Sequence, residues 1–218
     1  MQIKLGRYEK AAAGIVLLSI LIGIVLYPSM PELMASHWNA AGQVDGYMSK
    51  FWGLFLMPII SAILLGLFIA IPMIDPLAKN IKKFRKQFDM FVLLMMMFML
   101  YIYILTIGWN FGVKFGMTQA LAPALALLFY YMGAMMEESK RNWFIGIRTP
   151  WTMSSDRVWN ETNRLGGKLM KAAGVVALFG VVFPDFAFML ILAPVIAFAV
   201  FSVVYSYVIF KKQSKRKR

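Results

Sequence analysis

The chain has 218 residues, of which 61% are hydrophobic and 15% are charged, whereas a soluble domain has roughly 45–50% apolar and about 25% charged residues. It carries a net charge of +13, no cysteine and one histidine, which excludes disulfides, thiolate nucleophiles and metal sites built from several cysteines or histidines. We therefore expect no cofactor, and because the basic residues lie beside apolar segments, we assign them to anionic lipid headgroups rather than to direct binding of nucleic acid.

A membrane-spanning helix needs roughly 20 residues to cross a hydrocarbon core of about 30 Å. Six segments of this chain reach or approach that length, and each must be helical because backbone amides in lipid have no water to bond. We expect an all-α polytopic membrane protein that forms a single membrane domain over residues 1–218. The expected transmembrane helices are 11–27, 51–74, 90–109, 117–136, 168–183 and 186–210.

The fifth of these segments is the weakest. Its uninterrupted apolar run covers only the 12 residues from Ala172 to Phe183. It reaches full length if the helix begins earlier and the amines of Lys168 and Lys171 extend to the headgroups. A re-entrant hairpin formed with the sixth segment is the alternative.

The basic residues alternate between the two sides of the membrane. Of the 23 Lys and Arg residues, 21 lie in the N-terminal segment, the second loop, the fourth loop and the C-terminal tail, and only Lys50 and Lys114 lie in the other three loops. Because positive residues flank the cytoplasmic ends of spans, we expect both termini in the cytoplasm. On that same side, Asp89 lies one turn from Arg85, and we expect these two side chains to pair.

The first outer loop, residues 28–50, combines turn formers with polar and aromatic side chains. Gly42 and the pair Asp45-Gly46 tolerate the positive φ of tight turns. The candidate recognition residues of this loop are His37, Trp38, Asn39, Gly42, Asp45, Gly46 and Tyr47. The loop either recognises a peptide or another ligand, or forms a compact cap over the helices. His37 and Asp45 provide two ligands, which are too few for a metal site.

The fourth loop, residues 137–167, is called the inner motif below. Its Ser154-Ser155 pair provides a helix N-cap, and Asp156 complements the helix dipole. Four side chains of segment 156–165 share one helix face: Val158, Trp159, Thr162 and Leu165. We expect a short amphipathic helix on the inner leaflet, with an elbow at Gly166-Gly167 leading into the fifth span.

Part of the inner motif resembles the signature of the SdpI family. The resemblance rests on Ile145-Gly-Ile-Arg-Thr-Pro-Trp-Thr152, followed by Val158-Trp159, Asn163-Arg164 and Lys168. The outer loop, from Pro31 through His37-Trp-Asn39 to Ser49-Lys50, resembles a domain of unknown function that often precedes this signature. The resemblance implies these inner recognition residues: Gly146, Arg148, Thr149, Pro150, Trp151, Trp159, Asn163 and Arg164.

The resemblance implies a multipass protein of a prokaryotic plasma membrane that gives immunity to a secreted peptide toxin. It further implies a receptor that, with toxin bound, holds a cytoplasmic transcriptional repressor at the membrane, and it supplies no catalytic residue. We expect Arg148 and Trp151 to make the inner contact, or to brace the inner motif against the fourth and fifth spans. The oligomeric state is left open.

Two other functions remain as alternatives. One is a small-molecule or lipid transporter, which predicts a polar cavity at mid-membrane depth, and the other is a membrane enzyme with a site near His37 and Asp45. Division after the third span gives halves of opposite orientation, each with a long loop after its first span, as in the inverted repeats of transporters. Trp38-Asn39 and Gly46 match Trp159-Asn160 and Gly167 at equal spacing.

Overall fold

The computed structural model describes residues 6–215 and is mostly helical. Lys4 and residues 216–218, which entered the charge argument, lie outside the described residues. The helices are α1 (Arg7–Leu26), α2 (Lys50–Ile74), α3 (Ala78–Ile81), α4 (Arg85–Asn110), α5 (Met117–Glu138), α6 (Pro150–Ser154), α7 (Asp156–Leu178) and α8 (Ala187–Lys215), and the strands are β1 (Leu33–Trp38) and β2 (Val44–Ser49). Short 3-10 segments cover Tyr27–Ser29, Lys82–Phe84, Phe179–Val181 and Pro184–Phe186.

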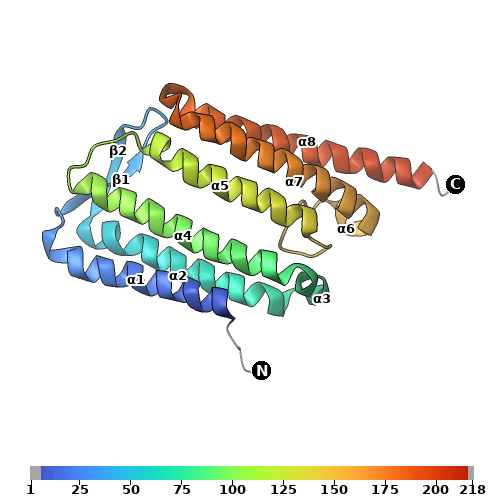
Figure 1. Cartoon of the computed structure of the whole chain (residues 1–218), viewed down its shortest axis with the longest axis horizontal. Coiled ribbons are helices and arrows are strands. Elements are labelled where there is room, and N and C mark those ends of the chain that lie inside the picture. The colour runs from blue at the N-terminus through green and yellow to red at the C-terminus, as the bar shows by residue number, and fades with distance from the viewer. Residues whose placement is uncertain (1–5, 216–218) are drawn as a thin grey trace.

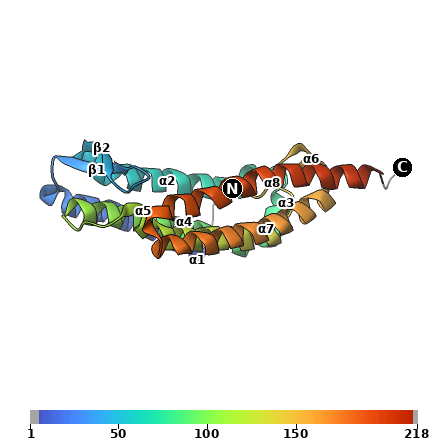
Figure 2. The same ribbon diagram turned by 90° about the horizontal axis from the view of Figure 1, so that it is seen from above.

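The long helices α1, α2, α4, α5, α7 and α8 lie along one common axis and alternate in direction (Figure 1). The two strands lie at one end of the bundle, called the hairpin end below. Helices α3 and α6 lie at the other end, as Figure 2 also shows. The chain enters α1 and leaves α8 at that same end, called the motif end below because it carries the inner motif. Six long helices of alternating direction bring both ends of the described chain to this same end of the bundle (Figure 1).

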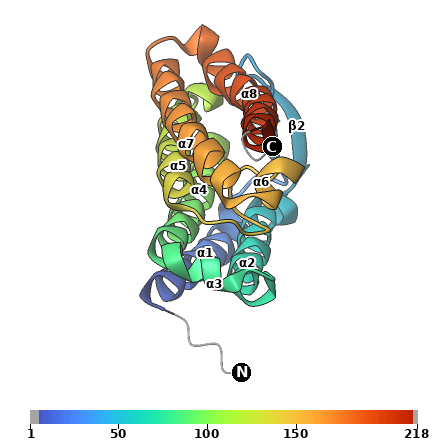
Figure 3. The same cartoon turned by 90° about the vertical axis from the view of Figure 1, so that its right-hand side faces the viewer.

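The helices form two groups of three. Helices α1, α2 and α4 pack against one another, as do α5, α7 and α8, and the two groups meet where α4 packs on α5. Figure 3 views the bundle from the motif end and shows α2 and α8 on the same side. This grouping is the one that division after the third expected span requires, and the inverted relation of the two groups stays a prediction.

The expectation of a polytopic membrane protein is confirmed. Five helical segments of the described chain are long and apolar enough to cross a membrane. They are Arg7–Ser29, Lys50–Ile74, Ala78–Asn110, Met117–Glu138 and Pro184–Lys215. Helix α7 lies alongside α5 but is too polar in its first half to join this set, so a sixth crossing stays a prediction (Figure 1).

The expected short helix with an elbow at Gly166-Gly167 is wrong, because α7 runs without a break from Asp156 to Leu178. The face predicted to lie on the inner leaflet is instead buried inside the protein: Val158 and Trp159 are fully buried. Gly167 and, two turns later, Gly174 are positions of close helix packing rather than a hinge. A Cβ atom on Gly167 would lie 2.5 Å from the carbonyl oxygen of Gly133, and one on Gly174 would lie 2.6 Å from that of Ala126. Small residues thus let the backbones of α5 and α7 approach closely.

The expectation of an all-α fold is also wrong, because the outer loop forms a β-hairpin. Strands β1 and β2 pair antiparallel from Leu33 opposite Ser49 to Trp38 opposite Val44, with irregular register around His37. Side chains along β2 alternate between partly buried and exposed, as a strand on the end of a bundle requires. The pairing satisfies backbone groups that a plain loop would leave to water.

An ionic cluster joins α1 to α4 near the motif end. The expected pair is confirmed, since Arg85 Nε lies 2.5 Å from Asp89 Oδ1. The same guanidinium also pairs with Glu9 of α1, whose side chain is only 8% exposed. Apolar side chains continue the contact between these helices, with Phe84, Phe88 and Met96 almost fully buried. One arginine therefore neutralises part of two carboxylates and fixes α1 against α4.

Candidate functional site

Two of the predicted outer residues build the turn of the hairpin. The Asn39 side-chain oxygen accepts hydrogen bonds from the backbone N–H groups of Ala41 and Gln43, both at 3.0 Å. Gly42 has a φ of +75°, a conformation that side chains other than glycine rarely adopt. These contacts explain the residue types without any ligand.

Four other predicted outer residues lie in the two strands of the hairpin, at its surface. His37 pairs with Asp45 through its Nδ1 atom, and the His37 side chain is 71% exposed. Gly46 lies opposite His37 in the strand pairing, and a Cβ atom there would lie 2.9 Å from that of His37. Tyr47 is 62% exposed. The enzyme alternative requires a reactive group beside His37, and the partner that the described residues give it is this carboxylate.

The hairpin is fixed to the bundle by a residue that the sequence analysis missed. The Asn110 side chain accepts from the Ala35 N–H at 2.8 Å and donates to the Ala35 carbonyl at 3.0 Å, as a neighbouring strand would. Met34 is fully buried against Gly53 of α2, where a Cβ atom would lie 2.6 Å from its sulfur. The signal in the sequence was an amide at the very end of an apolar span.

Trp38 joins the hairpin to a pocket in the bundle. Its ring packs edge-on against Trp109, with 5.7 Å between ring centroids. It lines a pocket of about 280 Å³ together with other residues of the two strands, and the remaining walls come from α2, α4 and α5, including Trp52, Thr106 and Met117. The Trp38 Nε1 atom is buried and has no hydrogen-bond partner among residues 6–215. The pocket therefore has mostly apolar walls, and the Trp38 ring that lines it carries a buried N–H donor without a partner among these residues.

At the motif end, a fully buried asparagine shapes the loop between α5 and α6. The Asn142 side-chain amide donates to the carbonyls of Lys140 and Ile145, and its oxygen accepts from the N–H groups of Phe144 and Ile145. Asp75, at the end of α2, accepts from the Trp143 N–H at 2.8 Å. These two residues were not predicted, because their partners lie in loops or far along the chain.

Gly146, Trp159 and Asn163 of the inner motif come together. Gly146 has a φ of +101°, and a Cβ atom there would lie 2.5 Å from the Asn163 side-chain oxygen. That oxygen accepts from the Ile147 N–H at 2.8 Å. Trp159 is fully buried and donates to the Ser139 carbonyl at 3.2 Å. Three predicted residues therefore hold the loop on α7.

The turn before α7 is fixed to α8. Thr149 caps α6, which begins at Pro150, and donates a hydrogen bond to Ser206 of α8 at 3.0 Å. The Trp151 ring lies 5.1 Å from that of Tyr207, also in α8. The ring contact of Trp151 is therefore with the last helix, which the expectation did not name, while α6 also packs on α7, which contains the expected fifth span. Whether Trp151 braces the motif or contacts a partner stays a prediction.

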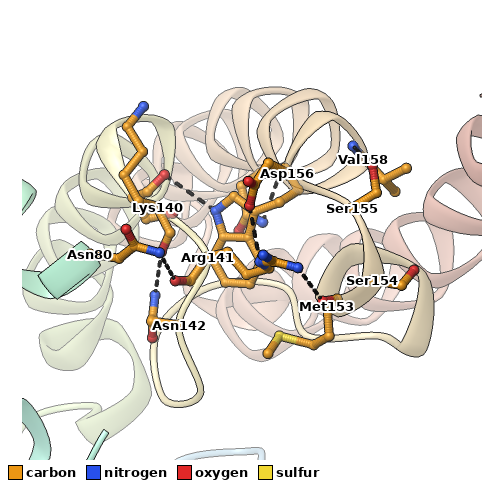
Figure 4. Close-up of polar contacts among 12 residues, drawn as sticks. Asn80, Lys140, Arg141, Asn142, Met153, Ser154, Ser155, Asp156 and Val158 are labelled. Carbon is orange, nitrogen blue, oxygen red and sulfur yellow. Dashed lines mark hydrogen bonds and ion pairs between the residues drawn. The ribbon is translucent and has the colours of Figure 1, made fainter. Parts of the chain in front are cut away.

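Figure 4 shows how Arg141 connects three parts of the motif. Its guanidinium lies 2.9 Å from Asp156 at the start of α7 and donates to the Met153 carbonyl at 2.8 Å. Its own carbonyl accepts from Asn80 of α3 at 2.7 Å (Figure 4). Arg148 and Arg164, by contrast, are exposed, and neither forms an ion pair within the described part of the chain. These two are the charged residues of the predicted inner set, and with Pro150 they are its exposed members.

A second pocket, of about 370 Å³, lies under the inner motif between the two helix groups. The transporter alternative predicts a polar cavity at mid-depth. This pocket and the one beside Trp38 have mostly apolar walls and lie toward opposite ends of the bundle. Neither gives that alternative support.

Comparisons with known proteins agree with both predicted motifs. Residues 138–206 match the SdpI/YfhL protein family, and residues 14–62 match a domain of unknown function, DUF1648. The first match covers most of the inner motif together with α6, α7 and much of α8, and the second covers the hairpin with the helices on either side.

A curated relative matches nearly the whole chain. The Immunity protein SdpI of Bacillus subtilis (strain 168) is 26% identical over 199 residues, which are 91% of this chain and 93% of that protein. No solved structure matches the chain. The expected family is confirmed: the chain is an SdpI-family membrane protein with a DUF1648 domain at its N-terminal end.

Proposed function

We propose that this chain protects the cell that makes it against a secreted peptide toxin, with the hairpin end outside a prokaryotic plasma membrane and both termini in the cytoplasm. The observation that carries the proposal is the similarity to the Immunity protein SdpI over 91% of the chain. The orientation is supported by the 21 basic residues that the sequence assigns to the side of the termini. Lys50 and Lys114 are the exceptions at the hairpin end.

The pocket beside Trp38 is the proposed contact for the toxin. A peptide offers apolar side chains, which suit the apolar walls of the pocket. A peptide carbonyl oxygen that reaches the buried Nε1–H of Trp38 would give this donor the partner that it lacks. Trp is among the residue types that most often dominate binding energy at interfaces. The bonds between Ala35 and Asn110 keep this surface in place before the toxin arrives.

Growth of a toxin-sensitive bacterial strain tests the proposal. Expression of the chain should restore growth in the presence of toxin, and Trp38→Phe, which keeps an aromatic ring but removes the N–H donor, should weaken the rescue. Trp143→Phe is the matched control, because Trp143 is 53% exposed at the opposite end of the bundle. Immunoblots of membranes must show equal amounts of the three proteins. The proposal fails if no related toxin is countered, or if the two variants rescue equally well.

The inner motif is the proposed contact for a cytoplasmic repressor. Exposed Arg148 and Arg164 provide positive charge that an acidic surface of a partner protein would complement. A candidate repressor should move to the membrane fraction when toxin is present, and Arg148→Glu with Arg164→Glu should prevent the move. A repressor that stays soluble with the wild-type chain and toxin would contradict this step while leaving immunity intact.

A further inference from the structure

The pocket under the inner motif opens sideways between the two helix groups. Its deep walls are buried side chains of α4 and α5, such as Phe91 and Met135. Phe68 of α2 and Phe198 of α8 also line the pocket, and both are only partly buried. Because these two helices lie on the same side of the bundle (Figure 3), we place the mouth of the pocket between them. The segment Phe144–Ile147 of the inner motif forms its roof at the motif end.

The lining suits hydrocarbon and offers nothing to a polar ligand. All the side chains around the pocket are apolar, and four of them are methionines, whose flexible thioethers adapt to irregular shapes. The backbone N–H groups of Ile145 and Ile147 in the roof already donate to Asn142 and Asn163. The volume of about 370 Å³ falls in the range of roughly 300–1,000 Å³ that holds small ligands.

The medium around the pocket opening determines which apolar ligand can enter it. Both helices that flank it belong to segments apolar enough to span a membrane, so the medium at the mouth is lipid hydrocarbon. The pocket lies in the part of the bundle nearest the motif end, where the basic residues gather. An anionic phospholipid matches both features, because its acyl chain suits the apolar pocket and its negatively charged headgroup suits the basic residues nearby.

A cation stands at the rim. Arg148 follows the roof segment directly and donates one hydrogen bond to the Trp143 carbonyl at 2.5 Å, which holds its guanidinium beside the roof. It is exposed and has no carboxylate within ion-pair distance among the described residues. A guanidinium has five N–H donors, so four remain, and its planar fork matches a phosphate.

We propose that the pocket holds one acyl chain of an anionic phospholipid whose phosphate binds Arg148. The acyl chain of the lipid fills the space between the two helix groups and packs beneath the Phe144–Ile147 roof. The site is separate from the toxin contact at the hairpin end and does not depend on the immunity function. It shares Arg148 with the proposed repressor contact, so bound lipid and repressor would compete for this one side chain.

The test uses the full-length chain, stripped of lipid in detergent and titrated with phosphatidylglycerol or phosphatidylcholine while bound lipid is counted by native mass spectrometry. The wild-type protein should bind one molecule of phosphatidylglycerol at a much lower lipid concentration than it needs to bind phosphatidylcholine. The Arg148→Gln substitution should lower the affinity for phosphatidylglycerol about fivefold. Arg164→Gln is the matched control, because Arg164 is an equally exposed cation of the same motif, and it should leave binding unchanged.

A second variant tests the pocket itself. The Met132→Trp substitution fills the cavity and should abolish tight binding of phosphatidylglycerol although Arg148 is still present. If gel filtration shows that this variant is not folded, the smaller substitution Met132→Phe is used in its place. Equal weakening by Arg148→Gln and Arg164→Gln would mean general attraction of anionic lipid and would overturn the site. Equal binding of the two lipids by wild type, or full binding by the filled variant, would overturn it as well.

Discussion

Substitution of Gly167 by alanine should destabilise the protein, although alanine is the better helix former. The new methyl carbon would lie 2.5 Å from the Gly133 carbonyl oxygen and 2.6 Å from Glu137 Cγ, so α5 and α7 must move apart. Overpacking of this kind costs about 1–3 kcal/mol, and the gain in helix propensity returns about 0.5–1 kcal/mol. The expected net loss therefore reaches about 2.5 kcal/mol, with a midpoint of about 1 kcal/mol.

The assay is thermal unfolding of the purified protein in detergent, monitored by the loss of the monodisperse peak in gel filtration. Gly66→Ala is the matched control, because Gly66 is also inside a long helix and a Cβ atom there meets nothing within 4 Å. The control should unfold at the wild-type temperature or above it, and Gly167→Ala should unfold well below. Equal stability of the two variants would refute the close contact between α5 and α7.

Three further substitutions test the contacts that organise the two ends. Asn110→Ala removes both hydrogen bonds to the hairpin and should speed amide exchange at β1 while leaving α5 and α7 protected. Arg85→Met leaves two carboxylates of α1 and α4 without their shared cation, so it should lower the unfolding temperature much more than Lys86→Met does. Asn142→Ala leaves four backbone groups of the inner motif without partners and should increase protease cleavage between α5 and α6, which unchanged cleavage would contradict.

The apolar pattern predicted most of the helices, and physical reasons explain where it failed. The expected span 51–74 differs from α2 by one residue, because long apolar runs leave the backbone no alternative to a helix. The hairpin was missed, because a short alternation of exposed and buried residues resembles a polar loop when strands are not expected. The Gly166-Gly167 pair suggested a bend from local propensity alone, whereas packing against Gly133 requires residues without side chains.

The candidate sites were predictable in part. Residues with unusual backbone or ring chemistry, such as Gly146 and Trp159, stood out in the motif, and they lie together in the fold. Asp75, Asn110 and Asn142 did not stand out, because single polar residues gain meaning only through partners that folding brings to them. The pockets depend on how the two helix groups meet, which no local pattern describes.

Cysteine accessibility in intact cells tests the membrane arrangement most directly, because the chain has no cysteine of its own. We would introduce Ala40→Cys in the hairpin turn, Ser154→Cys before α7, Asp185→Cys after α7 and Ser214→Cys near the end of α8, and label each with a membrane-impermeant maleimide. Ala40→Cys and Asp185→Cys should react in intact cells, and Ser154→Cys and Ser214→Cys should react only after lysis. Protection of Asp185→Cys together with Ser154→Cys would show that α7 does not cross, and reaction of Ser214→Cys in intact cells would contradict the orientation as a whole.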